Sequence, residues 1–319
     1  MTVVLHSLAL RLAQAAGVAL VVGILSFLMM QAMPGDMAFR IAAARYGYDL
    51  ASADLAETVR QELTLDAGPL VLFGQWMADL ARLDLGRSLV SGLPVWQEIT
   101  HQLGASLHLA VAALALSLLI GPPLGILAGL RAGGRFDRGL LVVAAALRAV
   151  PQFLLGLVLI VVFAVQLGLL PAAGHGDPAQ FVLPAATLAL GLAAASARIA
   201  RDAMAAFAAS PAQAFARTKG LSERQALRRH GLRNIAAPLL TYLGLQFVTL
   251  AEGVVVVETI FGWPGIGHAL IHAVFHRDVP MVQGTALVMG LGFVCVNAVI
   301  DMALRRIDPR QIAQPEGRA

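Results

Sequence analysis

The sequence predicts an all-α integral membrane protein, and two observations carry that prediction. Of the 319 residues, 58% are hydrophobic and 13% are charged, against roughly 25% charged residues in an average soluble domain. Long segments carry almost no charge, and each can supply the roughly 20 apolar residues that cross a bilayer core. We expect about six transmembrane helices, within residues 11–36, 98–131, 140–170, 177–198, 233–252 and 278–301.

The first apolar run predicts an uncleaved anchor. The run is too long for a signal-peptide core, has only Arg11 ahead of it, and lacks a clear small-x-small cleavage site before Pro34. Residues 1–33 are therefore assigned to an N-terminal tail and the first transmembrane helix.

The segment that follows, residues 34–100, differs in composition from the apolar runs. It mixes charges with apolar residues spaced by three and four, and it carries turn signals at residues 67–69 and 91–92. This pattern predicts a small external helical subdomain.

Basic residues predict the topology. They gather in residues 131–138 and again in residues 198–233, whereas the loop between these two, around residues 171–180, has no Lys or Arg. By the positive-inside rule the two basic segments are cytoplasmic, as is the basic C-terminal end, so both termini lie inside. We expect a five-helix membrane core over residues 101–310, with a cytoplasmic loop at 198–233, followed by a cytoplasmic tail at residues 311–319.

Several classes of function are excluded by what the sequence lacks. A pI of about 10.0 would fit nucleic-acid binding, but the basic residues lie between membrane spans without interleaved aromatic residues, so no nucleic-acid partner is expected. Neither His-Glu-x-x-His nor Gly-x-Ser-x-Gly is present, which argues against an intramembrane hydrolase, and no catalytic residue is assigned. The phosphate-binding loop Gly-x-x-x-x-Gly-Lys-[Ser/Thr] is also missing, so this chain is not expected to bind ATP or any cofactor. Cys295 lies in the last apolar run and predicts a packed membrane thiol rather than a disulfide or a metal ligand.

The most informative segment is the second basic one. Ser210 is followed by proline and, three residues on, by Gln213, a pattern typical of a capped helix start. Gly220 then predicts a C-terminal cap, and Ser222 with Gln225 repeats the start signal. We expect a short helix over residues 211–219, a turn, and a second helix that continues into the fifth span. By local physics alone, the short helix either docks a soluble partner or lies on the bilayer surface.

The same segment carries a resemblance to a known family. Residues 216–221 (Ala-Arg-Thr-Lys-Gly-Leu), with His230, Arg233 and Pro238, resemble the coupling-loop motif of permease subunits in the bacterial dipeptide/oligopeptide/nickel family of ABC importers. The similarity covers nearly the whole chain, in order. It continues in residues 34–36, 65–66, 84–86, 94–95, 169–171, 257–267, 277–280 and 308–310. The chain departs from the family pattern at Ala212 and Ala214, where peptide-transporting relatives usually carry Tyr and Arg.

The resemblance implies a type I importer-like permease in the bacterial inner membrane. Its partners would be a second homologous permease subunit, one or two ATP-binding subunits that hold ATP and Mg²⁺, and an external solute-binding protein. The implied cargo is a peptide or a related small solute; a nickel or metal-chelate importer of the same family is an alternative, and a stand-alone secondary transporter is another. The residues that would couple to the ATPase are Ala214, Phe215, Ala216, Arg217, Lys219, Gly220 and Leu221.

Polar residues inside the spans are candidates for the translocation path. An ionisable group at the centre of a span costs about 2.5–3.5 kcal/mol on insertion scales, so such groups are functional candidates by default. The candidates are Arg148, Gln152, Glu252 and Glu258. For Arg148 and Glu252 the alternative is a structural ion pair or a side chain that snorkels to the membrane surface.

Three histidines recur every four residues after the Trp-Pro-Gly turn, at His268, His272 and His276. A helix would place them on one face, where imidazoles can receive a divalent metal such as nickel. The interpretation we favour is a polar external helix whose histidines contact water or the binding protein.

Overall fold

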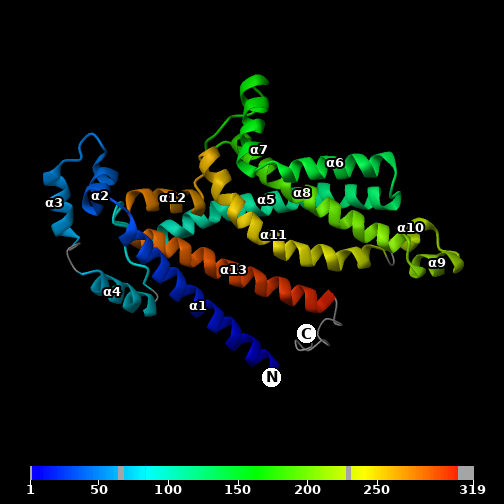
Figure 1. Ribbon diagram of the computed structural model, residues 1–319, viewed down its shortest axis with the longest axis horizontal. Coiled ribbons are helices and arrows are strands. Elements are labelled where there is room, and N and C mark those ends of the chain that lie inside the picture. The colour runs from blue at the N-terminus through cyan, green and yellow to red at the C-terminus, as the bar shows by residue number, and fades with distance from the viewer. Residues whose placement is uncertain (1, 64–67, 83, 228–230, 308–319) are drawn as a thin grey trace. The chain divides into compact units, whose positions relative to one another are not determined.

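The structure is a computed structural model that describes residues 2–63, 68–82, 84–227 and 231–307. Within these ranges the chain is almost entirely helical (Figure 1), with one isolated antiparallel bridge between Arg87 and Pro94. The prediction of an all-α protein is therefore confirmed. The physical reason is that a helix satisfies its own backbone hydrogen bonds, which lipid cannot do.

Most of the helices correspond to the predicted spans and to the predicted external subdomain. In chain order they are α1 (Thr2–Ala32), α2 (Met37–Tyr46), α3 (Ala53–Glu62), α4 (Pro69–Ala81), α5 (Val95–Leu130), α6 (Arg135–Ala149), α7 (Gln152–Leu159), the π-helix η1 (Ile160–Gln166), α8 (Pro178–Ala208), α9 (Pro211–Thr218), α10 (Glu223–Ala226), α11 (Leu232–Phe261), α12 (Ile266–His276) and α13 (Val279–Ile307).

Several helices are long and apolar enough to cross a membrane. Three qualify singly: α5, α8 and the part of α13 over Val279–Val299. Two bent pairs qualify together, α6 with Gln152–Gln166 at 103°, and Gly253–Phe261 with α12 at 78°. The described apolar stretch of α1 runs over Ala13–Met29. Five of the six apolar runs fall largely within one helix each, whereas the run over residues 140–170 is divided among α6, α7 and η1.

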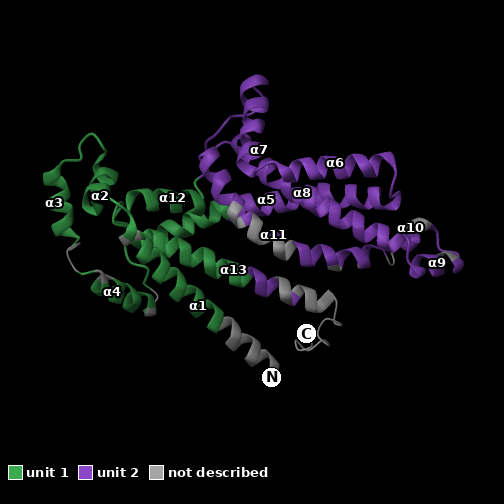
Figure 2. Cartoon of the chain, viewed as in Figure 1, with its two compact units in different colours: residues 1–106, 264–295 green, residues 107–263, 296–319 purple. Residues whose placement is uncertain are grey.

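The chain forms two compact units (Figure 2). Unit 1 comprises residues 1–106 and 264–295, and unit 2 comprises residues 107–263 and 296–319. The domain boundaries predicted from the sequence follow membrane topology and are a different division of the chain.

In unit 2, α8 is the central helix and packs against α6, α7 and α11. It also meets α5 along three glycines spaced by four. A Cβ at Gly121 would lie 2.1 Å from Ser196 Oγ, and one at Gly125 would lie 2.1 Å from the carbonyl oxygen of Ala197. At Gly129 the nearest atom would be the carbonyl oxygen of Arg201, at 2.5 Å. Small residues at this spacing let two membrane helices approach backbone to backbone.

In unit 1, the predicted external subdomain is helical, as expected. Asp36 caps α2 by accepting from the Ala38 N–H at 3.0 Å, and Ser52 caps α3. Ile41 and Val59 are fully buried between these two helices. Short polar side chains at helix starts fix where each helix begins, since they satisfy backbone N–H groups that the helix leaves free.

One small prediction was wrong. Cys295 is not packed but exposed on α13. A transmembrane helix has a face that no other part of its own chain covers, and apolarity of sequence alone does not say which residues lie on it.

Candidate functional site

The first candidate site is α9 and the turn after it. The Ser210 hydroxyl accepts from the Gln213 N–H at 3.3 Å, as predicted. The other half of the capping box does not form, because the Ser210 N–H donates to the carbonyl of Phe207 at 3.0 Å and needs no second acceptor. Gly220 has a φ of 75°, and the Leu221 N–H donates to the carbonyl of Ala216 at 3.2 Å, which closes the helix end.

The predicted coupling residues lie on this short helix and its turn. Ala216 is buried, whereas Ala214, Lys219 and Gly220 are exposed and Leu221 is half-buried. Phe215 is 61% exposed, with Lys219 Nζ 4.6 Å from the centre of its ring. The helix thus presents an aromatic ring and a cation away from unit 2. The side chain of Arg217 lies outside the described residues.

The helix predicted after this turn begins as expected, with the short helix α10. It covers Glu223–Ala226, where Ser222 and Gln225 form the reciprocal cap: the Gln225 N–H donates to Ser222 Oγ, and the Ser222 N–H donates to Gln225 Oε1. The predicted continuation crosses residues 228–230, which are outside the described residues. The next helix, α11, begins at Leu232.

The second candidate site is a cavity at the break between α6 and α7. The chain leaves the helical region at Val150, just before Pro151, where an α-helical conformation is disfavoured. A cavity of about 260 Å³ lies at this break, lined by α6, α7, α8 and α11. Its polar lining is Arg148, Gln152, Thr187 and Gln246. A broken helix that opens a polar cavity is a recurrent way to build a solute site in membrane transporters.

Among the described residues, Arg148 supplies the only charge that lines this cavity. Its Nη1 donates to the hydroxyl of Tyr242 at 3.4 Å, and among the described side chains it has no carboxylate partner. Arg148 lies in the last turn of α6, where the negative end of the helix dipole offers it partial compensation. A structural ion pair was one interpretation of Arg148, but Arg148 has no acidic partner in the described part of the chain.

Gln152 and Gln246 line the same cavity from facing helices. Gln246 is 7% exposed. The Gln152 amide lies directly over Gly253 of α11, where a Cβ would come within 2.2 Å of Gln152 Oε1. Glycine at position 253 is thus what allows Gln152 to occupy this position. Sequence reasoning missed Gln246 and Gly253 because only the packing of α11 against α7 brings them to the cavity.

Of the two candidate glutamates, only Glu258 has a described side chain. The side chain of Glu252 lies outside the described residues. Glu258 is fully buried and does not line the cavity. Its carbonyl accepts from the Trp263 N–H at 2.8 Å, and the Trp263 ring packs against His175 with centroids 4.7 Å apart. These contacts place Glu258 at the Trp-Pro-Gly turn that ends α11.

A second arginine of unit 2 is fully paired. Arg201 of α8 binds the buried carboxylate of Asp137 through two hydrogen bonds, from Nε at 2.7 Å and from Nη2 at 2.6 Å. The Gly133 N–H donates to the same carboxylate at 2.7 Å. The pair therefore anchors the predicted cytoplasmic loop before α6 to α8. No sequence pattern predicts this pairing, since 64 residues separate its members.

The three histidines do lie along one face of α12. Ring centroids are 4.5 Å apart for His268 and His272, and 5.6 Å apart for His272 and His276. Yet among the described residues no three His, Cys, Asp or Glu side chains are placed to hold a metal ion. The hypothesis of a nickel site on this helix therefore has no support among the described residues.

Helices long and apolar enough to cross a membrane, a separately capped short helix and a polar cavity at a broken helix are features expected of a membrane transport protein. The chain belongs to the family described as binding-protein-dependent transport system inner membrane component, whose model matches residues 121–313. It is accordingly the membrane permease subunit of an ABC importer.

Similar proteins from bacteria carry narrower descriptions. A putative peptide transport system permease protein of Brucella abortus is 38% identical over 308 residues, covering 94% of this chain and 96% of that protein. The glutathione transport system permease protein GsiC of Pectobacterium atrosepticum is 36% identical over 290 residues, covering 91% and 93%. In fold, the chain resembles a crystal structure of an amino acid ABC transporter, with a TM-score of 0.50, 22% identity, and coverage of 66% and 94%.

Proposed function

We propose that this permease moves short peptides, coupled through α9 to ATPase subunits that bind the ATP and Mg²⁺ this chain is not expected to bind. A second homologous permease subunit would complete the pathway, and an external binding protein would deliver the cargo. Both termini would face the cytoplasm. The supporting observation is the separately capped α9, which leaves Phe215 61% exposed beside Lys219. An exposed aromatic ring on a short rigid helix is a typical anchor for a partner's pocket.

The cargo assignment follows from the relatives. The two described above are named for peptide and glutathione transport, and glutathione is itself a tripeptide with two free carboxylates. The cavity lining supports a solute that carries a carboxylate, because Arg148 is the only charged residue among the described ones that line it, and it has no acidic partner among the described side chains. We propose that Arg148 and Gln152 line the translocation path.

The test uses the complete transporter in lipid nanodiscs, with binding protein and peptide. Phe215→Ala is compared with Phe136→Ala, because Phe136 is also exposed, at 54%, and lies at the start of α6. We expect Phe215→Ala to reduce peptide-stimulated ATP hydrolysis about 10-fold, the loss of roughly 1.4 kcal/mol from an interface anchor. Phe136→Ala should change it less than 2-fold.

Two results would overturn the proposal. If both phenylalanine variants behave alike, α9 is not the coupling element. If peptide crosses the membrane at an undiminished rate without any ATPase subunit, the chain works as a secondary transporter instead. Uptake of nickel but not of peptide would favour the metal-importer alternative.

A further inference from the structure

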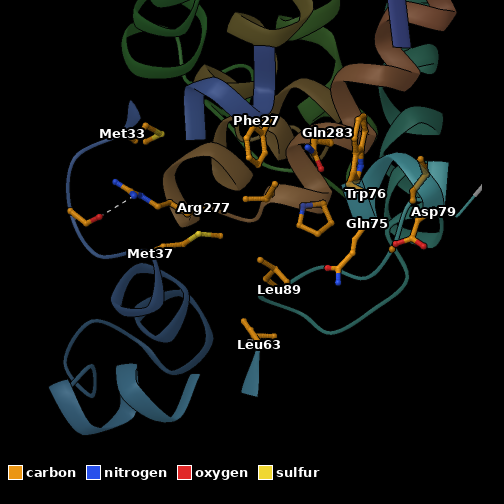
Figure 3. Close-up of a pocket in the computed structure, with 15 residues that line it drawn as sticks. Phe27, Met33, Met37, Leu63, Gln75, Trp76, Asp79, Leu89, Arg277 and Gln283 are labelled. Atoms are coloured by element: carbon orange, nitrogen blue, oxygen red, sulfur yellow. Dashed lines mark hydrogen bonds between the residues drawn. The ribbon is translucent and has the colours of Figure 1, made fainter. Parts of the chain in front are cut away.

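Unit 1 contains a cavity that the transport proposal does not use. Its volume is about 380 Å³. It lies between the end of α1, the segment from α2 to α4, and the start of α13 (Figure 3). Among the residues that line it are Phe27, Met33, Trp76, Asp79, Arg277 and Gln283.

Most of the residues that line this cavity are apolar. The cavity lies beside the predicted external end of the first span, where lipid head groups are expected. Phe27 and Met33 lie at the end of the first predicted span, on the side predicted to be external. Phe27 packs on Phe73 of α4 with ring centroids 5.2 Å apart. At the start of α4, Leu70 is 84% exposed and Val71 is 54% exposed. A helix with such an exposed apolar end suits the interface between lipid tails and head groups. A molecule that enters the cavity from the membrane interface beside α4 would be a lipid.

One wall of the cavity carries polar groups, and one of them lacks a hydrogen-bond partner among the described residues. The Trp76 indole is 91% buried, and its Nε1–H has no hydrogen-bond partner among the described residues. Beside it in Figure 3 lies Gln283, which is 1% exposed. Gly23 of α1 leaves room for the indole, because a Cβ there would lie 2.2 Å from the ring. Buried N–H groups nearly always find an acceptor, so the occupant is expected to bring an oxygen to this wall.

The charges of the lining are balanced. Asp79 and Arg277 lie on opposite sides of the view in Figure 3, with the apolar side chains between them. Arg277 is fixed by the carbonyls of Pro34 and Gly35, the latter at 3.0 Å from Nη1. One carboxylate and one guanidinium complement a head group that carries both signs better than one with a net negative charge.

We propose that this cavity is a binding site for a single zwitterionic phospholipid of the phosphatidylethanolamine class. The head group would lie between Asp79 and Arg277, an ester carbonyl would accept from Trp76 Nε1, and part of an acyl chain would lie against Phe27 at the end of the first predicted span. The site would anchor the external subdomain to the bilayer. It is independent of cargo and of ATP coupling.

The experiment is native mass spectrometry of the complete transporter after stepwise delipidation in detergent. Phosphatidylethanolamine is then added back, and phosphatidylglycerol is added in a parallel series. Trp76→Phe keeps the ring and removes only the N–H. Trp96→Phe makes the same change at a tryptophan that is 60% exposed and does not line the cavity.

We expect one phosphatidylethanolamine per chain to be retained in the original protein and in Trp96→Phe, and the affinity to fall about 10-fold in Trp76→Phe. Met37→Trp, which fills the cavity, should abolish retention while the complex still assembles. Three outcomes would each overturn the proposal. Both lipids could be retained equally, both tryptophan variants could retain lipid equally, or the cavity could bind no lipid and hold only water. Cross-linking of the binding protein at Met37 in the absence of lipid would assign the cavity to a protein partner and overturn it as well.

Discussion

Two arginines of unit 2, Arg201 and Arg148, differ in what compensates their charge. Arg201 binds two carboxylates, Asp137 through two hydrogen bonds and Asp202 at 3.0 Å. Arg148 meets a neutral hydroxyl, Tyr242, and no carboxylate among the described side chains. A charge whose partner is built into the same chain serves the fold. A charge within a predicted span that lacks such a partner is the better candidate for contact with a solute or a second subunit.

The largest effect is expected at the paired arginine. Arg201→Gln leaves the buried carboxylate of Asp137 without its cation, and breaking one side of a buried ion pair is strongly destabilising. We expect the thermal midpoint of the detergent-solubilised protein to fall by roughly 5–10 °C. The measurement is the temperature at which half of the protein has aggregated. Transport should fall only in proportion to the lost protein.

The double variant Arg201→Leu with Asp137→Leu is the control. Replacing both partners by apolar residues removes the unpaired charge, so it should recover much of the lost stability. If Arg201→Gln is as stable as the original protein, the distinction between the two arginines fails.

Arg148 is expected to behave in the opposite way. Arg148→Gln should leave the thermal midpoint within about 2 °C but reduce the transport of a peptide with a free carboxyl terminus on the order of 10-fold, the usual effect of losing one charge-assisted hydrogen bond. Arg148→Lys, which keeps the charge, should retain more transport. The measurement is uptake into proteoliposomes at saturating ATP.

A peptide with an amidated carboxyl terminus sharpens this test. It should be transported equally by the original protein and by Arg148→Gln, because it offers no carboxylate. Equal losses for both peptides would mean that Arg148 acts on the fold or on the partner subunit rather than on the solute.

The smallest effect is expected at Gly253. An alanine there would place its Cβ 2.2 Å from Gln152 Oε1, so the amide must leave its position in the cavity lining. We expect peptide uptake to fall about 2- to 5-fold, which corresponds to roughly 0.5–1 kcal/mol. Stability should change little, because the far end of the Gln152 side chain can move. Gly139→Ala is the control, because a Cβ at Gly139 meets nothing within 4 Å. Equal uptake by the two variants would show that Gln152 does not contribute to the path.

Much of the fold followed from local rules. Lipid demands helices, so the apolar runs predicted where helices lie, and the capping pattern at Ser210 predicted the start of α9. The capping pattern failed in one respect, because a carbonyl of the neighbouring helix α8 already accepts the N–H that the pattern assigns to a side chain. Gln213 does not complete the cap at Ser210, because the preceding residues of α8 already accept the Ser210 N–H.

The candidate site was only partly predictable. Arg148 and Gln152 stood out as polar residues within an apolar run, and both line the cavity at the break beside Pro151. Gln246 did not stand out, since a lone glutamine in a membrane helix has many roles. Its role follows from the facing helix.

What the sequence by itself determined is the class of protein, the number of apolar segments and the position of the short capped helix, because each depends on residues close together in the chain. What only the tertiary structure decided is which polar groups meet. Asp137 reaches Arg201 across 64 residues, while Arg148 reaches no acid in the described chain. Trp76 lies buried on Gly23, and its N–H has no acceptor among the described residues. Such pairings depend on how closely two helices approach, and that distance is set by small residues such as Gly125 and Gly253 rather than by the polar residues themselves.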